Sequence, residues 1–479
     1  MFRGSPARRA ALDLISRRRR RGAHMRELLR SSSMLDRLGP RDRALAVRIA
    51  LGVTSTSGTL DVLINAHLHH GAHLEPRVRD AMRISCYEIC WLQTPDAVAV
   101  AEGVELVRSV APRAAGLANA VLRHISADDA PRVADACHRL ALGDPNLLAK
   151  DIALAAGFPE WLSYQLLCSC GAEVCQQTAL AQLEPAPVFV AVNTALLCER
   201  ESVRRMAEAG LDPCPLPFPG AWRINAAGRL ASSGLVDNAV VLPCDLAAQM
   251  VARIAAPVPG RRMLEVGQGR GTKTALFELV ALEAGGFAEL TSIDSEGFKV
   301  RVASSRMAKA GVSGHVNSLV FDGRDLARQN LPPALAGGFD TVFVDAPCSG
   351  TGTMRRHPEI VWGLERKSVS PTRTDSLPTL QLRLLRAASA RVRPGGALLY
   401  ATCSLLAQED EDIIEAFLVS DEGEGFEVSS VLEAPGVSTL PKAAYELLAA
   451  NVSSEGFFCS HPTADSFDGH FCARLVRTR

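Results

Sequence analysis

The sequence lacks an excess of charge of either sign. Lys and Arg together number 52, and Asp and Glu together also number 52, among 479 residues. Any binding of nucleic acid must therefore depend on local basic patches and not on bulk charge. The sequence also lacks a run of about 18 apolar residues, and no apolar segment follows the N-terminal arginines, so neither a membrane span nor a secretion signal is predicted. We expect a cytoplasmic protein with no membrane partner.

The 13 cysteines lack the spacings that are typical of disulfide frameworks and zinc sites. Cys168, Cys170 and Cys175 form a cluster, and Cys86 and Cys90 lie one helical turn apart. Neither group has a matching second pair or histidines at ligand spacing. We therefore expect reduced thiols, with these five buried as small apolar side chains, and no metal site.

The length predicts two or three domains, and 47% hydrophobic residues can form several cores. Apolar residues at spacings of three and four predict an all-α domain over residues 1–128. Its five arginines at 17–21 are either a solvated helix end or a patch that contacts phosphates. Small and polar residues with Pro and Gly predict a linker at 129–145, and short β-like runs predict a small α+β subdomain at 146–243.

Strands and helices alternate from residue 244 to residue 479. The predicted strands, with helices between most of them, cover residues 262–266, 290–294, 316–321, 340–345 and 397–403. Such alternation is typical of a mostly parallel, doubly wound α/β sheet of the Rossmann-like kind. In such a sheet, ligands bind beyond the carboxyl ends of the strands.

A glycine-rich loop follows the first of these strands. It contains Gly267, Gly269 and Gly271 and ends at Lys273. Glycines permit a tight turn and a close approach to a ligand, and the next helix begins with free N–H groups. A nicotinamide fingerprint would have its third glycine one residue later, which disfavours a dehydrogenase.

Acidic residues lie at the ends of three successive strands, namely Glu265, Asp294 and Asp322. Asp294 is placed to accept hydrogen bonds from ribose hydroxyls, and Asp322 to accept one from the exocyclic amine of adenine. Either aspartate alone is as well explained as a turn or cap residue. Together the three favour an adenosine and would repel a phosphate chain, so we predict a cationic, phosphate-free cofactor such as S-adenosylmethionine.

Two later strands each end at a cysteine, in Asp345-Ala346-Pro347-Cys348-Ser349 and in Thr402-Cys403-Ser404. We expect both thiols and the Asp345 carboxyl group to face one crevice. A thiolate that adds to carbon 6 of a pyrimidine makes carbon 5 nucleophilic enough to take a methyl group. If Asp345 is protonated or shares a proton, it steadies the charge that develops on the ring. The simpler alternative is two ordinary buried thiols.

These motifs closely resemble those of the bacterial 16S rRNA cytosine-C5 methyltransferases of the Sun/Fmu (RsmB-like) type. The matching segments are residues 244–249, 345–352, 355–362, 402–404 and 468–471. The N-terminal domain resembles the NusB-like helical domain of bacterial members and ends in the matching residues 119–123. The resemblance implies an RNA-binding NusB-like domain and a class I methyltransferase domain over residues 244–479.

The resemblance also implies roles for single residues. Cys403 would be the nucleophile, Cys348 would resolve the adduct, and Asp345 would contact the cytosine and the donor. The donor S-adenosylmethionine would be bound by Glu265, Gly267, Gly269, Gly271, Lys273, Asp294, Asp322 and Asp345. RNA phosphates would be contacted by Arg355, Arg356 and His357, although these three are also explained as a solvated loop.

The resemblance implies a monomer that methylates carbon 5 of a cytosine in RNA, in particular 16S rRNA. One departure is the donor loop, where the family has Asp-x-Cys-Ala-Ala-Pro-Gly-Gly-Lys and this chain retains only Gly271 and Lys273. The alternative is therefore a non-catalytic RNA-binding or ribosome-assembly protein with a drifted donor loop. A DNA cytosine methyltransferase is less favoured, because those enzymes have the nucleophile on the Pro-Cys strand and lack a NusB-like domain.

Overall fold

The computed structural model describes residues 5–478 except 70–72 and 93. The chain forms two compact units. The first, here called the helical unit, comprises Met1–Pro185 and Thr353–Arg366. The second, here called the sheet unit, comprises Ala186–Gly352 and Lys367–Arg479. The helical unit thus contains a segment that the sequence places inside the methyltransferase domain.

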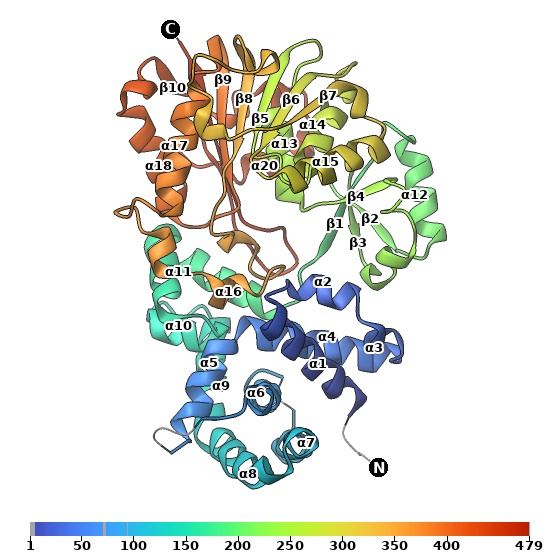
Figure 1. The fold of residues 1–479 in the computed structure, drawn as a ribbon, viewed down its shortest axis with the longest axis vertical. Coiled ribbons are helices and arrows are strands. Elements are labelled where there is room, and N and C mark those ends of the chain that lie inside the picture. Colours follow the sequence, from blue (N-terminus) through green and yellow to red (C-terminus); the bar gives the residue numbers. More distant parts are fainter. Residues whose placement is uncertain (1–4, 70–72, 93, 479) are drawn as a thin grey trace. The chain divides into compact units, whose positions relative to one another are not determined.

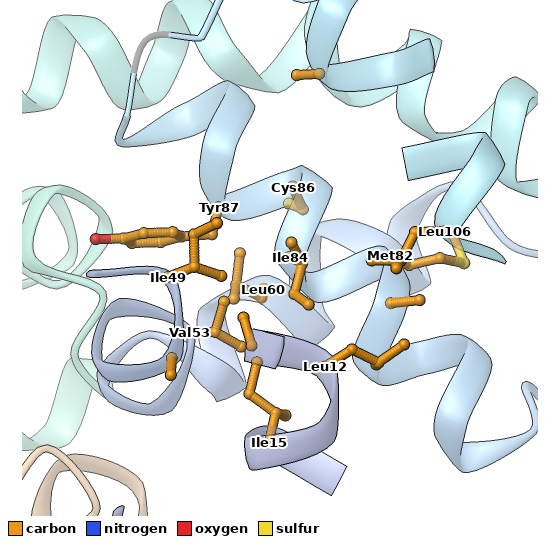
Figure 2. Packing of buried hydrophobic residues seen from close by; sticks show 14 of the residues in the cluster. Leu12, Ile15, Ile49, Val53, Leu60, Met82, Ile84, Cys86, Tyr87 and Leu106 are labelled. Carbon is orange, nitrogen blue, oxygen red and sulfur yellow. The ribbon is translucent and has the colours of Figure 1, made fainter. Parts of the chain in front are cut away.

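The helical unit consists of α-helices and short irregular turns. Its helices are α1 (Pro6–Arg21), α2 (Met25–Arg30), α3 (Ser33–Asp36), α4 (Pro40–Ser55), α5 (Ser57–Ala66), α6 (Pro76–Cys90), α7 (Asp96–Val110), α8 (Ala115–His124), α9 (Ala130–Ala141), α10 (Ala149–Ala156), α11 (Glu160–Leu183) and α16 (Ile360–Gly363). Figure 2 shows buried side chains that pack in one core, among them Leu12, Ile49, Leu60, Ile84 and Leu106. The predicted all-α N-terminal domain is confirmed.

The arginine run forms the end of α1, where positive charge is favourable beside the helix C-terminus. Two of its members already have carboxylate partners. Arg17 pairs with Asp13 at 2.8 Å, and Arg19 pairs with the buried Asp80 at 3.0 Å. The interpretation as a helix end therefore accounts for part of the run.

The predicted linker at 129–145 is wrong for most of its length, because residues Ala130–Ala141 form α9. Val133, Ala136 and Leu140 are buried on one face of this helix. Pro131 lies in its first turn, where a missing N–H group costs little. The next two helices, α10 and α11, also belong to the helical unit, so the α+β region begins near residue 186 and not at 146.

Most of the five clustered cysteines behave as expected. Cys86, Cys90 and Cys175 are buried, and Cys86 lies in the core that Figure 2 shows. Cys170 is half-buried, but Cys168 is exposed, so burial was wrong for Cys168. None of the 13 cysteines, all of which lie in the described residues, forms a disulfide bond.

The sheet unit begins with a small antiparallel sheet. Within the described residues its strands have the order β2-β3-β1-β4 and the bounds β1 (Val188–Val192), β2 (Pro213–Pro215), β3 (Ala221–Ile224) and β4 (Val241–Pro243). Helix α12 (Glu199–Glu208) packs on one face through Met206. On the other face, Phe189 and Ala191 share a core with α13 (Leu246–Ala255).

A larger sheet follows, with eight strands in the described part of the chain and the order β10-β12-β9-β8-β5-β6-β7, while β11 also pairs with β12. The bounds are β5 (Arg262–Val266), β6 (Glu289–Asp294), β7 (Val316–Val320), β8 (Phe339–Asp345), β9 (Val392–Thr402), β10 (Phe426–Val428), β11 (Phe458–Ser460) and β12 (His470–Arg477). Strands β5 to β9 are parallel, whereas β12 is antiparallel to β9. The Rossmann-like α/β fold is confirmed, with a mixed edge (Figure 1).

Alternating residues of the strands pack into two cores, one on each face of the larger sheet. Phe343 and Leu399 pack with α13 and α14 (Thr272–Glu283), while Val342 and Tyr400 pack with α17 (Leu377–Ser389) and α18 (Glu411–Leu418). The remaining helices of the unit are α15 (Gly297–Ala310), α19 (Pro435–Ser438) and α20 (Lys442–Ala449). With helices on both faces, the strand ends are left as the edge for ligands.

In the described part of the chain, no single helix is long and apolar enough to cross a membrane; only the bent pair α4 and α5, taken together, meets that criterion.

Candidate active site

The two strand-end cysteines lie side by side. Cys348 follows β8 and Cys403 follows β9, and in these parallel neighbours Asp345 lies opposite Ala401. The sulfur atoms are 3.4 Å apart. The backbone N–H of Gly352 donates to the carbonyl of Cys403 at 2.9 Å, which joins the two loops. The structure thus brings together the thiols that the sequence assigns to one edge.

The two thiols differ in acidity. A hydrogen bond from Cys348 and the charge of Lys273 lower the pKa of Cys403, although burial acts in the opposite direction. The same hydrogen bond together with burial raises the pKa of Cys348 well above its usual value. Because the thiolate is the reactive form, Cys403 is the better nucleophile of the pair.

Asp345 has a charged partner. Lys273, in the first turn of α14, donates to both carboxylate oxygens of Asp345 at 2.8 Å. Burial lowers the pKa of Lys273, but the charge and the hydrogen bond of Asp345 outweigh this effect and raise it. Lys273 is therefore held in its charged ammonium form beside Asp345. Lys273, which was expected to bind the donor, contacts Asp345 here.

A buried carboxylate joins the two cysteine loops. Glu409 is fully buried, and its Oε1 accepts from the backbone N–H of Ser349 and from Nε2 of Gln381, both at 2.9 Å. Its Oε2 accepts from the hydroxyl of Ser404 at 2.6 Å. Ser349 and Ser404 each follow one of the two cysteines. One side chain therefore fixes both loops, and Gln381 adds a bond to the carbonyl of Pro347 at 2.9 Å.

Sequence reasoning missed Glu409 and Gln381. Glu409 stands six residues after Cys403 and just before α18, where an acidic residue is usual for reasons of helix capping alone. Gln381 lies on α17, in a stretch with the spacing of an ordinary packed helix. The available signal was the run of small polar residues around each cysteine, which needs buried hydrogen-bond partners.

The glycine loop approaches the backbone of Asp345 closely. Gly267 has φ +91°, a region that other residues avoid. A Cβ atom at this position would lie 2.3 Å from the carbonyl oxygen of Asp345. The loop can therefore pass this close to Asp345 only with glycine at position 267.

Asp294 supports the same loop. Its Oδ2 accepts from the N–H of Gly269 and its Oδ1 from the N–H of Glu296, both at 2.9 Å. Lys299 lies 3.8 Å from Oδ1. Asp294 therefore acts as a cap or turn residue after β6, as one of its two interpretations predicts. Each carboxylate oxygen keeps a lone pair that a ribose hydroxyl can use.

Glu265 lies beneath the loop and is fully buried. Its Oε2 accepts from the hydroxyls of Thr274 at 2.7 Å and Ser292 at 2.6 Å. Burial raises the pKa of Glu265 to about 7, although these hydrogen bonds act against the rise. The side chain is thus in contact with the end of β6 and the start of α14, and any effect on a ligand would be exerted through them.

Asp322 is half-buried after β7 and bonded to Arg324. It accepts from the backbone N–H of Arg324 at 3.0 Å and from its guanidinium at 2.5 to 3.0 Å. The hydrogen bond from Arg324 lowers the pKa of Asp322. Nearby, Oε1 of Gln268 is buried and finds no hydrogen-bond donor in the described part of the chain. These acceptors and the glycine loop fit an adenosine cofactor such as S-adenosylmethionine.

The residues expected to contact RNA belong to the helical unit, in its segment Thr353–Arg366. Arg355 is buried, Arg356 is half-buried and His357 is exposed. Within the helical unit, Arg26 donates to the carbonyl of Arg356, and the indole N–H of Trp362 donates to the carbonyl of Gly157 at 2.9 Å. The segment is thus anchored on helices of this unit, and of the three residues expected to contact RNA only His357 is exposed.

Two groups in the described residues bring three potential metal ligands within 4.8 Å of one another, namely His24, His357 and Glu359, and His67, His124 and Asp128. In each group a histidine already pairs with the carboxylate. Neither group contains a cysteine. Histidine–carboxylate pairing is sufficient to explain both.

Two family models match the chain. The model described as 16S rRNA methyltransferase RsmB/F matches residues 252–475, and the NusB family model matches residues 5–127. Ribosomal RNA small subunit methyltransferase B of Xanthomonas campestris pv. campestris is 31% identical over 386 residues, which are 79% of this chain and 80% of that protein. The protein of the same name from Klebsiella pneumoniae subsp. pneumoniae is 27% identical over 451 residues and covers 92% of each chain.

Solved structures share the fold. The structure of PH0851 superposes with a TM-score of 0.74 at 20% identity and covers 99% of each chain. NSun6 from Pyrococcus horikoshii, crystallised with SFG, has a TM-score of 0.53 at 16% identity and covers 67% of this chain and 99% of its own. At these identities the likeness concerns the fold alone.

Proposed function

Because this chain belongs to the family of ribosomal RNA small subunit methyltransferase B, which methylates ribosomal RNA with S-adenosylmethionine, we propose that it methylates carbon 5 of a cytosine in 16S rRNA through a covalent bond to Cys403. The observation that carries this proposal is the pair of sulfur atoms 3.4 Å apart, one of which has a lowered pKa. Packing alone does not require two thiols whose pKa values are shifted in opposite directions at a ligand-binding edge.

Cys403 starts the reaction. Its thiolate forms a bond to carbon 6 of the cytosine, and the electrons of the 5,6 double bond move so that carbon 5 becomes nucleophilic. When bound, S-adenosylmethionine would supply an electrophilic methyl group to carbon 5, and the electrons of the broken sulfur–methyl bond would remain on the departing S-adenosylhomocysteine. The target base must leave its stack to reach the thiol, at a cost of a few kcal/mol.

Cys348 assists release. After methyl transfer, the proton on carbon 5 leaves to a base, its bonding electrons restore the 5,6 double bond, and the carbon–sulfur bond breaks with its electrons on Cys403. A thiol hydrogen bond from Cys348 stabilises the departing thiolate, just as it lowers the pKa of Cys403 in the free protein. A raised pKa keeps Cys348 protonated and able to donate.

Asp345 and Lys273 orient the ring. The Asp345 carboxyl group would lie against nitrogen 3, and the Lys273 ammonium group 2.8 Å away would share its proton as negative charge develops there. On the donor side, Gly267, Gly269 and Gly271 would leave room for the cofactor. Asp294 would accept hydrogen bonds from the ribose hydroxyls of the cofactor, and Asp322 would accept one from its adenine amine.

RNA contacts would come in part from the helical unit. We propose that Arg355, Arg356 and His357 contact RNA phosphates, with exposed His357 making the most direct contact. The NusB-like helices would add further contacts. The protein would act as a monomer without a membrane partner.

The second candidate is a non-catalytic RNA-binding or ribosome-assembly protein, which the altered donor loop favours. Calorimetric titration with S-adenosylmethionine separates the two, because the enzyme must bind the donor and the binding protein need not. The presence of both thiols and Asp345 in one site favours the enzyme.

Replacing single cysteines tests the proposed mechanism. We expect Cys403→Ala to abolish methylation and any covalent RNA adduct. We expect Cys348→Ala to accumulate a protein–RNA band that survives denaturing electrophoresis, since elimination is slowed more than attack. Cys459→Ala, a half-buried cysteine of β11, is the matched control and should resemble the wild type. An adduct in Cys403→Ala would refute the assigned roles.

A further inference from the structure

The sheet unit contains a pocket that the proposed reaction does not use. Its volume is about 270 Å³. One wall is formed by residues 236–243 before and along β4, and another by Val302, Ser305, Arg306 and Lys309 of α15. These four residues lie at positions i, i+3, i+4 and i+7 of the helix, so they share one face. Neither cysteine, nor Asp345, lines this pocket.

The pocket holds two cations, Arg306 and Lys309, that form no ion pair in the described residues. Neither Arg306 nor Lys309 has a carboxylate within 4.0 Å in the described part of the chain, and the guanidinium of Arg306 donates to the hydroxyl of Thr272. Burial and the neighbouring charge of Arg270 lower the pKa of Arg306, the direction expected in a positive field. A half-buried cation without a counterion is a site that an anion can complete.

The wall before and along β4 is apolar apart from the exposed Asp237. Ala239, Val241 and Leu242 are buried, and Val236 is half-buried. An inorganic anion alone would gain nothing from this wall, whereas a ligand with an anionic end and a flat apolar body would use both sides. A single nucleotide has that form, with its phosphate opposite its base.

We infer that this pocket binds one nucleotide of the RNA substrate outside the reacting base, with its phosphodiester against Arg306 and Lys309 and its base against the apolar wall. The inference rests on the proposed RNA substrate. The ligand is a phosphate ester in either of two forms, a chain nucleotide or a free nucleotide. Phosphate contacts of this kind position an RNA without specifying its sequence.

A charge placed on the rim tests the inference with little risk to the fold. Ser305 is exposed and lines the pocket, so Ser305→Asp adds a negative charge and Ser305→Asn is its isosteric neutral control. The probe is a fluorescein-labelled single-stranded RNA of mixed sequence, followed by anisotropy at several salt concentrations. We expect Ser305→Asp to weaken binding about tenfold and Ser305→Asn to leave it unchanged.

Removal of the cations gives the second measurement. In Arg306→Ala/Lys309→Ala we expect RNA affinity to fall by about tenfold or more, and the salt slope to fall by about 0.7 for each phosphate that the protein no longer neutralises. Lys442→Ala on α20, an exposed lysine paired with Glu446, is the control and should not change either quantity. Affinity for S-adenosylmethionine should stay at the wild-type value in every variant.

Each other outcome is decisive. If the wild type binds RNA and the pocket variants bind it equally well, the inference is wrong and the proposed function stands. If a wild type that binds S-adenosylmethionine has no measurable affinity for RNA, both fail. If Arg306→Ala/Lys309→Ala loses S-adenosylmethionine, the pocket serves the donor and the inference is overturned. Tight binding of uridine monophosphate, abolished in the same variant without a change in RNA affinity, identifies a free-nucleotide site and also overturns it.

Discussion

The two ends of the same sheet edge differ in how their polar groups are satisfied. At the cysteine end, Glu409 accepts three hydrogen bonds from the chain, and Lys273 and Asp345 neutralise one another. At the donor end, the buried Oε1 of Gln268 finds no donor in the described residues, and each carboxylate oxygen of Asp294 keeps a lone pair. One end is set by internal bonds before any ligand arrives, and the other leaves acceptors for a ligand.

This difference teaches which changes should affect chemistry and which should affect binding. Catalytic groups must be fixed to within a fraction of an ångström, so their supporting bonds are made by the protein itself. A cofactor site can leave acceptors open, because the cofactor supplies the missing donors. Variants at the cysteine end should therefore lower the rate, and variants at the donor end should lower affinity for S-adenosylmethionine.

Apart from the loss of Cys403 itself, the largest effect is expected at Glu409. Glu409→Ala leaves the buried N–H of Ser349 and the amide of Gln381 without an acceptor, at a cost of about 1–3 kcal/mol each. We expect the methylation rate to fall about 100-fold while affinity for S-adenosylmethionine stays within about twofold, as measured by single-turnover kinetics and calorimetry.

Glu409→Gln separates position from charge. The amide oxygen can keep the bonds to Ser349 and Gln381, so the loops should stay in place. The negative charge of Glu409, which contributes to raising the pKa of both thiols, is removed. We expect a rate within about tenfold of the wild type and alkylation of Cys403 by iodoacetamide at lower pH. If Glu409→Gln is as inactive as Glu409→Ala and its thiol titration is unchanged, the positioning role is refuted.

The next effect is expected at the donor loop. Gly267→Ala places a Cβ 2.3 Å from the carbonyl oxygen of Asp345, so the loop must shift. We expect affinity for S-adenosylmethionine to fall about tenfold or more, which corresponds to about 1.4 kcal/mol. Gly395→Ala is the control, because Gly395 has a similar φ of +74° but no atom within 4 Å of the added Cβ. This variant should therefore show only the backbone strain of about 1–2 kcal/mol, without a steric clash. Equal donor affinity in both variants would contradict the close approach.

The smallest effect is expected from Glu265→Gln and depends on pH. The folded protein raises the pKa of Glu265 from 4.5 to about 7, so the protonated form is favoured by folding. The stability that this provides is present below pH 4.5 and is lost as pH rises through 7. Gln cannot ionise, so we expect the variant to be more stable than the wild type by about 1 kcal/mol at pH 8 and not at pH 4.5, by denaturant unfolding. A constant difference across this range would refute a neutral Glu265.

Much of the fold could be predicted because apolar runs bounded by turn residues determine strands. The strand at 262–266 has the bounds of β5, and the strand predicted at 290–294 differs from β6 by one residue. The linker was wrong because Pro131 was counted as a breaker, although in the first turn of a helix proline is tolerated. That Thr353–Arg366 belongs to the helical unit could not be predicted, since adjacency in sequence says nothing of distant packing.

The site was predicted where a residue lies at a strand end. Cys348 and Cys403 converge because β8 and β9 are parallel neighbours, which the alternation of strands and helices implies. The pairing of Lys273 with Asp345 and the role of Glu409 depend on side chains that meet only in three dimensions, across 72 residues in the first case. Residue types alone could not assign those partners.

The most direct test of the central claim is to map the covalent bond. RNA that contains 5-fluorocytosine at the target position traps the adduct, because fluorine on carbon 5 cannot leave as a proton does. Digestion and mass spectrometry then identify the peptide that carries the nucleotide. We predict the peptide that contains Cys403, with Cys348 unmodified; attachment to Cys348, or methylation of the RNA without any adduct, would contradict the account.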